Sequence, residues 1–291
     1  MGFSVNSYFS GFGLMDIGLS QAGVSIGQSF EIDGTASRVQ RENLGHDVVT
    51  SDISKKLVSD ENDSDVMVFT YPCTKYSTIA DIHGTRSGDE LFLHAFRHMA
   101  LKRPEVYVIE NVPGMRAFPL VMEAMAQLPD YWVISFCPIR SQTWLPQRRD
   151  RLIIFGAKRN FGWREPEVGK RASLASIVED DPRVTLPKAI GNRMQGKYRD
   201  RPIISDPAEG DIAPTCVAHY AKDKSTRLLA DKHFPMGVRP YSVREYARLQ
   251  GVPDWYAFNC SDTEAYRGIG NGVSVPVGRW IGQELTRYFN Q

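Results

Sequence analysis

Apolar and polar residues alternate along most of this chain with two different periods. Short, nearly continuous apolar runs predict strands at residues 3–9, 25–31, 65–71, 106–109, 131–137 and 152–157. Segments in which apolar positions recur every three or four residues predict helices at residues 14–23, 34–43, 91–102, 241–250 and 273–289. Strands that alternate with helices favour an α/β fold with a doubly wound, mostly parallel sheet, whose ligands bind beyond the carboxyl ends of the strands.

This regular pattern fades in one long segment, residues 158–238, where proline, glycine and charged residues are frequent. We interpret the segment as a small, irregular second lobe. Residues 1–157 and 239–291 then form the larger lobe, to which the chain returns through a helix with Ser242 as its expected N-cap and Glu245 three residues later. The sequence therefore predicts two lobes, the larger of which is discontinuous.

The composition is that of an ordinary soluble protein, with 42% apolar and 24% charged residues. No run approaches the roughly 18 apolar residues of a membrane span, and the first residues lack the features of a secretory signal. The four cysteines are too sparse for a disulfide framework and form no metal-binding cluster. We therefore expect a reduced, cytoplasmic protein without a metal. The formal net charge is only +1, so a nucleic-acid partner would have to meet basic residues gathered on one face.

A glycine-containing segment follows the first predicted strand and precedes a helix, with Phe9, Gly11 and Gly13 as its marked positions. Glycines at this place let the backbone approach a ligand near the positive end of the helix dipole, although a plain tight turn would use them equally well. Glu31 ends the second predicted strand, where an acid can accept hydrogen bonds from ribose hydroxyls, and Asp52 is placed to meet an adenine amino group. Together these residues indicate an adenosine-containing cofactor, and both a nicotinamide dinucleotide and S-adenosylmethionine fit.

A thiol, an acid and two arginines lie next to other predicted strands at the same edge of the sheet. Cys73 follows a buried strand, and Glu110 ends the next one, where a carboxyl group can hold or donate a proton. Arg149 and Arg151 precede a further strand and alternate, so both side chains can point to one side of it. A thiolate is a nucleophile, whereas a lone cysteine is more often an inert buried residue. These four side chains together suit attack by a thiolate on an electron-poor ring. The acid would protonate the ring, and the arginines would hold its oxygen.

The order of these motifs resembles the DNA cytosine-5 methyltransferase family over nearly the whole chain, from about residue 5 to 285. The matching segments are, in order, Phe9-Ser-Gly-Phe-Gly13, Glu31, Asp52-Ile53, Pro72-Cys73 with Ser77, Glu110-Asn-Val112, Gln147-Arg-Arg-Asp-Arg151, Ser242 to Pro253 and Gly270-Asn-Gly-Val273. One departure is Thr74, where the family usually has glutamine. That departure concerns how the loop at 74–90 fills the gap left by a flipped base.

The resemblance implies a Rossmann-like, S-adenosylmethionine-dependent enzyme, a DNA (cytosine-5-)-methyltransferase. Cys73 would attack carbon 6 of a cytosine flipped out of the duplex, and carbon 5 would then take the methyl group. Glu110 would bind the exocyclic amine and protonate N3, and Arg151 would hold O2. Arg149 would steady the catalytic loop and a nearby phosphate.

The same resemblance assigns binding residues and partners. It places the cofactor on Phe9, Gly11, Gly13, Glu31, Ile32, Asp52, Ile53, Pro72, Leu91, Asn271 and Val273. It makes residues 158–238 a short target-recognition lobe and double-stranded DNA the partner, with DNA contacts expected from Ser77, Arg193, Lys197 and Arg199. It also implies a monomer in a restriction–modification or phage-protection setting, with a cognate restriction endonuclease as a possible partner.

Three alternatives stay open on the sequence. An RNA cytosine methyltransferase with transfer RNA as substrate would use the same fold. A catalytically inactive DNA-binding relative would also share it, although the presence of Cys73, Glu110 and both arginines counts against that reading. A nicotinamide-binding oxidoreductase fits the first 60 residues and explains nothing after them.

Overall fold

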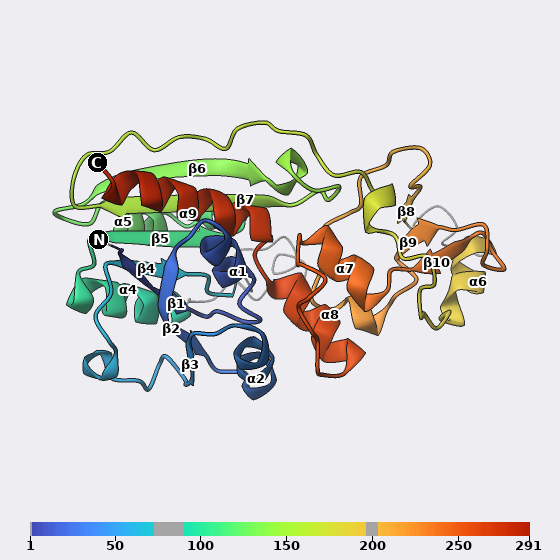
Figure 1. Cartoon of the computed structure of the whole chain (residues 1–291), viewed down its shortest axis with the longest axis horizontal. Helices are drawn as coiled ribbons and strands as arrows, with labels where there is room; N and C mark the ends of the chain where they lie inside the picture. The colour runs from blue at the N-terminus through green and yellow to red at the C-terminus, as the bar shows by residue number, and fades with distance from the viewer. Residues whose placement is uncertain (1, 73–89, 196–202) are drawn as a thin grey trace. The chain divides into compact units, whose positions relative to one another are not determined.

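The computed structural model describes residues 2–72, 90–195 and 203–291, and the fold is drawn in Figure 1. The larger sheet contains β1 (Ser4–Tyr8), β2 (Ser25–Glu31), β3 (Asp47–Thr50), β4 (Val66–Phe69), β5 (Val106–Asn111), β6 (Trp132–Arg140) and β7 (Asp150–Ala157). The helices that accompany it are α1 (Leu14–Gln21), α2 (Gly34–Asn43), α4 (Glu90–Lys102), α5 (Pro119–Ala126) and α9 (Val275–Phe289). Among the described residues, no helix is long and apolar enough to cross a lipid bilayer.

The strand order of this sheet is β3-β2-β1-β4-β5-β7-β6. The strands β1 to β5 are parallel, and β7 runs antiparallel to both of its neighbours, β5 and β6. Every residue of β4 and β5 is buried, as expected for central parallel strands that are covered on both faces. The predicted doubly wound, mostly parallel sheet is therefore confirmed.

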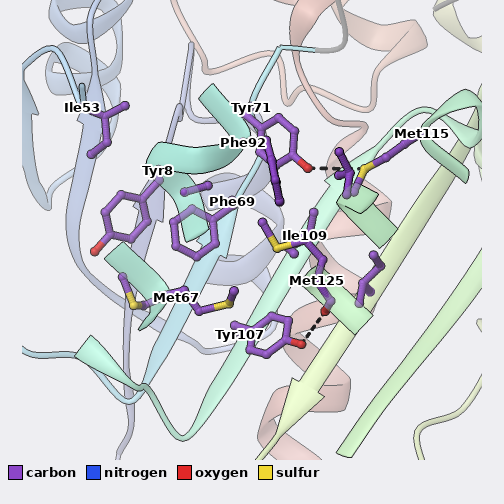
Figure 2. Close-up of a cluster of buried hydrophobic side chains, with 14 of the residues drawn as sticks. Tyr8, Ile53, Met67, Phe69, Tyr71, Phe92, Tyr107, Ile109, Met115 and Met125 are labelled. Atoms are coloured by element: carbon purple, nitrogen blue, oxygen red, sulfur yellow. Dashed lines mark hydrogen bonds between the residues drawn. The ribbon is translucent and has the colours of Figure 1, made fainter. Parts of the chain in front are cut away.

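Helices cover the two faces of the sheet. On one face α4 and α5 contribute Phe92 and Met125 to a cluster with strand residues such as Phe69 and Ile109, which Figure 2 shows in close-up. On the other face Trp280 of α9 packs edge-on against the rings of Phe136 and Phe155, at centroid distances of 5.6 and 5.7 Å. This two-sided burial stabilises the sheet, whose strand ends carry the site.

The chain divides into two compact units, and the sheet belongs to the first, Met1–Arg140 with Asp150–Pro166 and Val275–Gln291. The second unit consists of Ser141–Arg149 and Glu167–Ser274. It contains a three-stranded sheet in the order β10-β9-β8, and its elements are β8 (Ile203–Ser205), β9 (Arg227–Ala230), β10 (Val238–Pro240), α6 (Ala189–Gln195), α7 (Val243–Leu249) and α8 (Asp262–Asn271).

Two helices that follow residue 238 pack inside the second unit. The ring of Tyr246 in α7 stacks on that of Tyr220 at 4.8 Å, and Tyr266 in α8 meets the same ring at 5.2 Å. The buried guanidinium of Arg239 binds both carboxylate oxygens of Glu245 at 2.7 Å, which ties β10 to the start of α7. The compact unit therefore extends beyond residues 158–238, whose role as a target-recognition lobe stays a prediction.

Most predicted elements are present, and those missed were short or polar. The predicted helix over 241–250 is α7, with Ser242 and Glu245 forming the expected capping box. The strand β3 has only four residues, and α5 begins at a proline after a 3₁₀ turn, so neither has enough turns or alternation to show a period. The helix α8 is mostly polar, yet it opens with a second capping box, Ser261 with Glu264, which is a signal that the sequence does carry.

Glycines let α1 and α9 pack in close contact. A Cβ atom at Gly18 would lie 2.2 Å from the carbonyl oxygen of Val275, and one at Gly278 would lie 2.6 Å from the carbonyl oxygen of Met15. The last helix, α9, packs along α1, the helix that follows the first strand. Because backbone stands at the contact, no side chain can move aside to make room.

The substitution Gly18→Ala is therefore expected to destabilise the protein by about 2–4 kcal/mol of unfolding free energy, since overpacking against backbone forces the two helices apart. Chemical denaturation of the purified variant measures this. The control is Gly34→Ala at the start of α2, where a Cβ atom would meet nothing within 4 Å; that variant should be neutral or slightly more stable. Equal stability of the two variants would contradict the packing argument.

Candidate active site

The segment between β1 and α1 forms a tight loop at the carboxyl end of the sheet. Phe9, Gly11 and Gly13 all have left-handed backbone conformations, with φ angles of 61°, 58° and 69°. Only glycine adopts this region without strain, so the two glycines are required by the turn and Phe9 carries strain. The loop leads directly into α1, whose N-cap is Gly13, so the positive end of that helix dipole faces the loop.

Glu31, the last residue of β2, is tied to this loop. One carboxylate oxygen accepts from the backbone N–H of Gly11 at 2.7 Å, and the other accepts from the N–H of Asp33 at 2.8 Å. Burial raises the pKa of the Glu31 carboxyl above its usual value, and the two backbone hydrogen bonds offset this only in part. The structure therefore brings the predicted glycine loop and the predicted acid together.

Two further predicted cofactor residues, Ile32 and Asp52, lie at the ends of neighbouring strands. Ile32 follows β2, and its large apolar side chain is 64% exposed. Asp52 follows β3 and caps a turn, in which its carboxylate accepts from the N–H and the hydroxyl of Ser54 at 3.0 and 2.6 Å. These hydrogen bonds, that of the Ser54 hydroxyl first, lower the pKa of Asp52. An exposed apolar face and an ionised acid thus stand on the Glu31 side of the sheet edge.

Apolar side chains from several elements form one wall beside the glycine loop. Ile53 is buried in the cluster of Figure 2, and Phe9 and Leu91 pack against that cluster from its partly buried rim. The ring of Phe9 meets that of Tyr71 edge-on, with centroids 6.1 Å apart. Three predicted cofactor residues that lie far apart in the sequence therefore contribute to one apolar surface.

The chain leading to residue 73 is anchored to the end of β5. Asn111 donates its side-chain N–H to the carbonyl of Tyr71 at 3.2 Å, and the hydroxyl of Tyr71 points at the sulfur of Met115, 3.4 Å away (Figure 2). Pro72 is exposed. Cys73 itself, with Thr74, Ser77 and the other residues up to 89, lies outside the described residues, so its expected role stays a prediction.

Glu110 and Arg151 form the central pair of the site. They lie on the adjacent antiparallel strands β5 and β7, and the guanidinium Nε of Arg151 is 2.7 Å from a carboxylate oxygen of Glu110. The side chain of Arg151 is 12% exposed and that of Glu110 is 8% exposed. A charged donor and a carboxyl acceptor therefore stand side by side at the strand end next to Tyr71 and Pro72. The sequence placed both at this edge of the sheet without predicting their pairing.

Arg149 takes a different place from the one that its alternation with Arg151 suggested. It belongs to the second unit, is 3% exposed, and donates to the carbonyls of Cys216, Gly270 and Gly272 at 2.9, 3.2 and 2.7 Å. Arg149 therefore holds three backbone carbonyls by hydrogen bonds. The two arginines have different surroundings because Arg149 belongs to the second unit and Arg151 to the first. The expected contact of Arg149 with the catalytic loop falls on residues outside the described part of the chain.

The predicted cofactor residues Asn271 and Val273 lie in the segment that Arg149 holds. Gln250 donates to the carbonyls of Ile269 and Gly272 at 2.9 and 3.2 Å, and so fixes the same backbone from α7. Asn271 ends α8 with an exposed side chain, and Val273 is buried. Both belong to the second unit, and their part in cofactor binding stays a prediction.

The predicted DNA-binding residues are only partly described, since Ser77, Lys197 and Arg199 fall outside the described ranges. Arg193 is engaged within the second unit, where its guanidinium binds Asp223 at 2.6 Å and the hydroxyl of Ser225 at 2.8 Å. This pairing joins α6 to the turn before β9, and it gives Arg193 a structural task in addition to the predicted one.

A buried thiol in the second unit is excluded as an alternative nucleophile. Cys216 is 1% exposed, and burial raises the pKa of its thiol to about 12. Such a group stays protonated at neutral pH and does not attack. Sequence reasoning missed Asp16, although its signal is detectable, because it is a charged residue among the apolar residues of α1. It included Asn111 in a motif but gave that residue no role.

Comparisons with known proteins give one family and one fold. The model of a family described as C-5 cytosine-specific DNA methylase matches residues 3–287. The type II methyltransferase M.NlaX of Neisseria lactamica is 29% identical to this chain, and the match covers 97% of this chain and 96% of that protein. Two solved structures match over 100% of both chains: the Entamoeba histolytica methyltransferase EhMeth (TM-score 0.84, 15% identity) and the S. pombe Dnmt2 methyltransferase (TM-score 0.81, 19% identity).

Proposed function

The chain belongs to the C-5 cytosine-specific DNA methylase family, and from this premise we propose how its residues methylate DNA. It is a DNA (cytosine-5-)-methyltransferase, and its relatives include type II methyltransferases. The assignment of steps to residues rests above all on the ion pair of Glu110 and Arg151 at 2.7 Å. A carboxyl beside a guanidinium complements the edge of cytosine, which offers an acceptor at O2, an acceptor at N3 and a donor at the exocyclic amine.

The residues near the glycine loop fit S-adenosylmethionine as the cofactor, whose sulfonium group supplies the methyl. Glu31 presents a half-buried carboxylate next to the N–H of Gly11 and is suited to hold ribose hydroxyls. Ile32 offers an exposed apolar face for the adenine ring, and Asp52 offers an acceptor for its amino group. We also assign Phe9, Ile53, Pro72 and Leu91 to this site.

Cofactor binding should weaken on acidification at a higher pH than an ordinary glutamate would cause. Because the pKa of Glu31 is raised, its carboxyl takes up a proton early as the pH falls, and it then loses acceptor capacity for the ribose. Affinity should be full above this pKa and fall by about tenfold per pH unit below it. Calorimetric titration with S-adenosylmethionine between about pH 7.5 and 5 measures this.

The matched variants for that titration are Glu31→Gln and Glu42→Gln. Glu42 is exposed and pairs with Arg38 on α2. The Glu31→Gln protein should bind weakly with a flatter pH profile, and the Glu42→Gln protein should follow the unmodified one. A pH profile that is the same in all three proteins would remove Glu31 from the cofactor site.

The chemistry at the base begins with a thiolate. The sulfur of Cys73 forms a bond to carbon 6 of the flipped cytosine, and the electron pair of the 5,6 double bond moves into the ring. Glu110 delivers a proton to N3 and accepts a hydrogen bond from the exocyclic amine, so negative charge does not accumulate. Carbon 5 becomes nucleophilic and takes the methyl, and the sulfonium donor would be left as a neutral thioether. A base then removes the proton from carbon 5, the bond from sulfur to carbon 6 breaks so that Cys73 leaves as the thiolate, and the proton on N3 returns to Glu110.

Arg151 has two tasks in this scheme. Its guanidinium donates to O2 of the base, which withdraws electrons from the ring, and its contact with Glu110 fixes the carboxyl in the plane of the pyrimidine. Arg149 acts indirectly, since it holds the backbone around Asn271. The mutual fixing of Glu110 and Arg151 prepares the polar edge of the site before the base arrives.

We further propose that residues 158–238 recognise the target sequence in double-stranded DNA, with contributions from Arg193, Lys197, Arg199 and Ser77. The names of the relatives support a place in a restriction–modification system with a cognate endonuclease. Incubation of the purified protein with methyl-labelled cofactor should label duplex DNA and leave transfer RNA unlabelled. Bisulfite sequencing of DNA from cells that express the chain should then give the target site. Label in transfer RNA alone would refute the assignment to DNA.

A further inference from the structure

A network of buried polar side chains lies beneath the glycine loop, away from the base-binding pair. Its centre is Gln40 of α2, which is fully buried, and its charged member is Asp16 of α1, also fully buried. Gln40 donates to a carboxylate oxygen of Asp16 at 2.7 Å, and its own carbonyl oxygen accepts from the hydroxyl of Ser10 at 2.9 Å. None of these three residues has a part in the chemistry described above.

Ser10 is the residue of the loop through which this network acts. It lies between Phe9 and Gly11, two of the residues with left-handed backbone. Its N–H donates to the carbonyl of Phe30 at 3.1 Å, and its carbonyl accepts from the N–H of Gly13 at 2.8 Å. The hydrogen bond from the Ser10 hydroxyl to Gln40 therefore fixes the middle of the loop.

The loop also rests directly on Gln40. A Cβ atom at Gly13 would lie 2.9 Å from the amide nitrogen of Gln40 and 2.7 Å from a methyl carbon of Leu44. Three left-handed residues within five are a costly conformation, which persists only where the surroundings impose it. The side chain of Gln40 is one of the groups that impose it here.

The charge of Asp16 orients the amide of Gln40. A carboxylate only accepts hydrogen bonds, so the amide nitrogen of Gln40 points to Asp16 and its oxygen is left to receive the hydroxyl of Ser10. Ser29 donates to the same carboxylate oxygen at 2.7 Å, and His46 stands 3.7 Å from it. The direction of every bond from Asp16 to the loop is thereby set by one buried charge.

We propose that Gln40 is a positioning residue for the cofactor: oriented by Asp16, it holds Ser10 and thereby keeps the glycine loop in the shape that binds S-adenosylmethionine. The inference rests on the proposed cofactor site. The helix α2 thereby controls cofactor affinity, although it supplies no residue to the cofactor site. Loss of the Gln40 amide leaves the loop free to relax from its strained shape, so binding has to restore that shape first.

The test is calorimetric titration of Gln40→Met with S-adenosylmethionine. Methionine keeps the volume of the side chain and removes the hydrogen bonds to Asp16 and Ser10, together with the contact to His46. The dissociation constant should rise about tenfold, and the KM for the cofactor should rise with it while kcat stays within about twofold. The matched control is Ser29→Ala, which removes a different hydrogen bond to Asp16, one that does not involve the glycine loop. That variant should lose stability to a similar degree and keep its cofactor affinity.

A second variant covers the case in which Gln40→Met folds poorly. Ser10→Ala removes one hydroxyl and should raise the dissociation constant about threefold. The double variant should bind no more weakly than Gln40→Met alone, because both changes break one connection. Unchanged affinity in Gln40→Met and Ser10→Ala, or an equal loss in Ser29→Ala, would overturn the inference. Failure of the unmodified protein to bind the cofactor would instead overturn the proposed function.

Discussion

Replacement of Cys73 by serine is expected to abolish methyl transfer while leaving DNA binding intact. A serine hydroxyl stays protonated at neutral pH and is a much weaker nucleophile than a thiolate, so bond formation at carbon 6 fails. The rate should fall by at least about three orders of magnitude. Single-turnover transfer of labelled methyl to DNA measures the rate, and gel retardation with the same DNA measures binding.

The control for that variant is Cys260→Ser, at a half-buried cysteine of the second unit. It makes the same chemical change and should retain full activity. A Cys73→Ser protein that methylates at more than a few per cent of the unmodified rate would remove the covalent step from the mechanism. An equal loss in Cys260→Ser would show that general damage, rather than loss of the nucleophile, explains the result.

The substitution Glu110→Gln is expected to have the second largest effect, a fall in kcat of about 10²–10⁴. The amide keeps the shape of the side chain and can still bind the guanidinium of Arg151, but it delivers no proton to N3. The negative charge of the adduct then stays in the ring, and the barrier to attack rises. The KM for DNA should change little, because most of the protein–DNA contact lies elsewhere.

Glu284→Gln is the matched control for this second variant. Glu284 is 7% exposed and pairs with Arg287 at 2.5 Å on α9, which makes it another buried glutamate in an ion pair of the same unit. Steady-state kinetics of the two variants, with thermal unfolding beside them, separate chemistry from stability. Full activity in Glu110→Gln, or the same loss in both variants, would contradict the role given to Glu110.

The sequence was informative about the strands and about the residues that end them. Continuous apolar runs such as Val106–Ile109 mark buried parallel strands, and residues placed immediately after such a run fall at one edge of the sheet. For that reason the residue pattern alone predicts the strand-end positions of Glu31 and Glu110 that the structure has. The pairing of Glu110 with Arg151 followed only in part, since the antiparallel register of β5 and β7 has no signature in the residues themselves.

The sequence was less informative where side chains satisfy backbone groups. Arg149 and Arg151 differ by two positions and look alike, yet the first clamps three carbonyls of the second unit and the second binds Glu110. Which of two arginines is buried depends on which carbonyls lack partners, and that is decided by tertiary packing. The same applies to Gln40, whose role depends on a buried acid in another helix.

The most direct test of the account is covalent trapping of Cys73 on a target duplex that carries 5-fluorocytosine at the methylated position. Fluorine at carbon 5 leaves no proton to be removed after methyl transfer, so the bond between sulfur and carbon 6 persists. Incubation with S-adenosylmethionine should give a complex that survives denaturation, and mass spectrometry should locate the base on the peptide that contains Cys73. Absence of the complex, or its attachment to another residue, would contradict the mechanism.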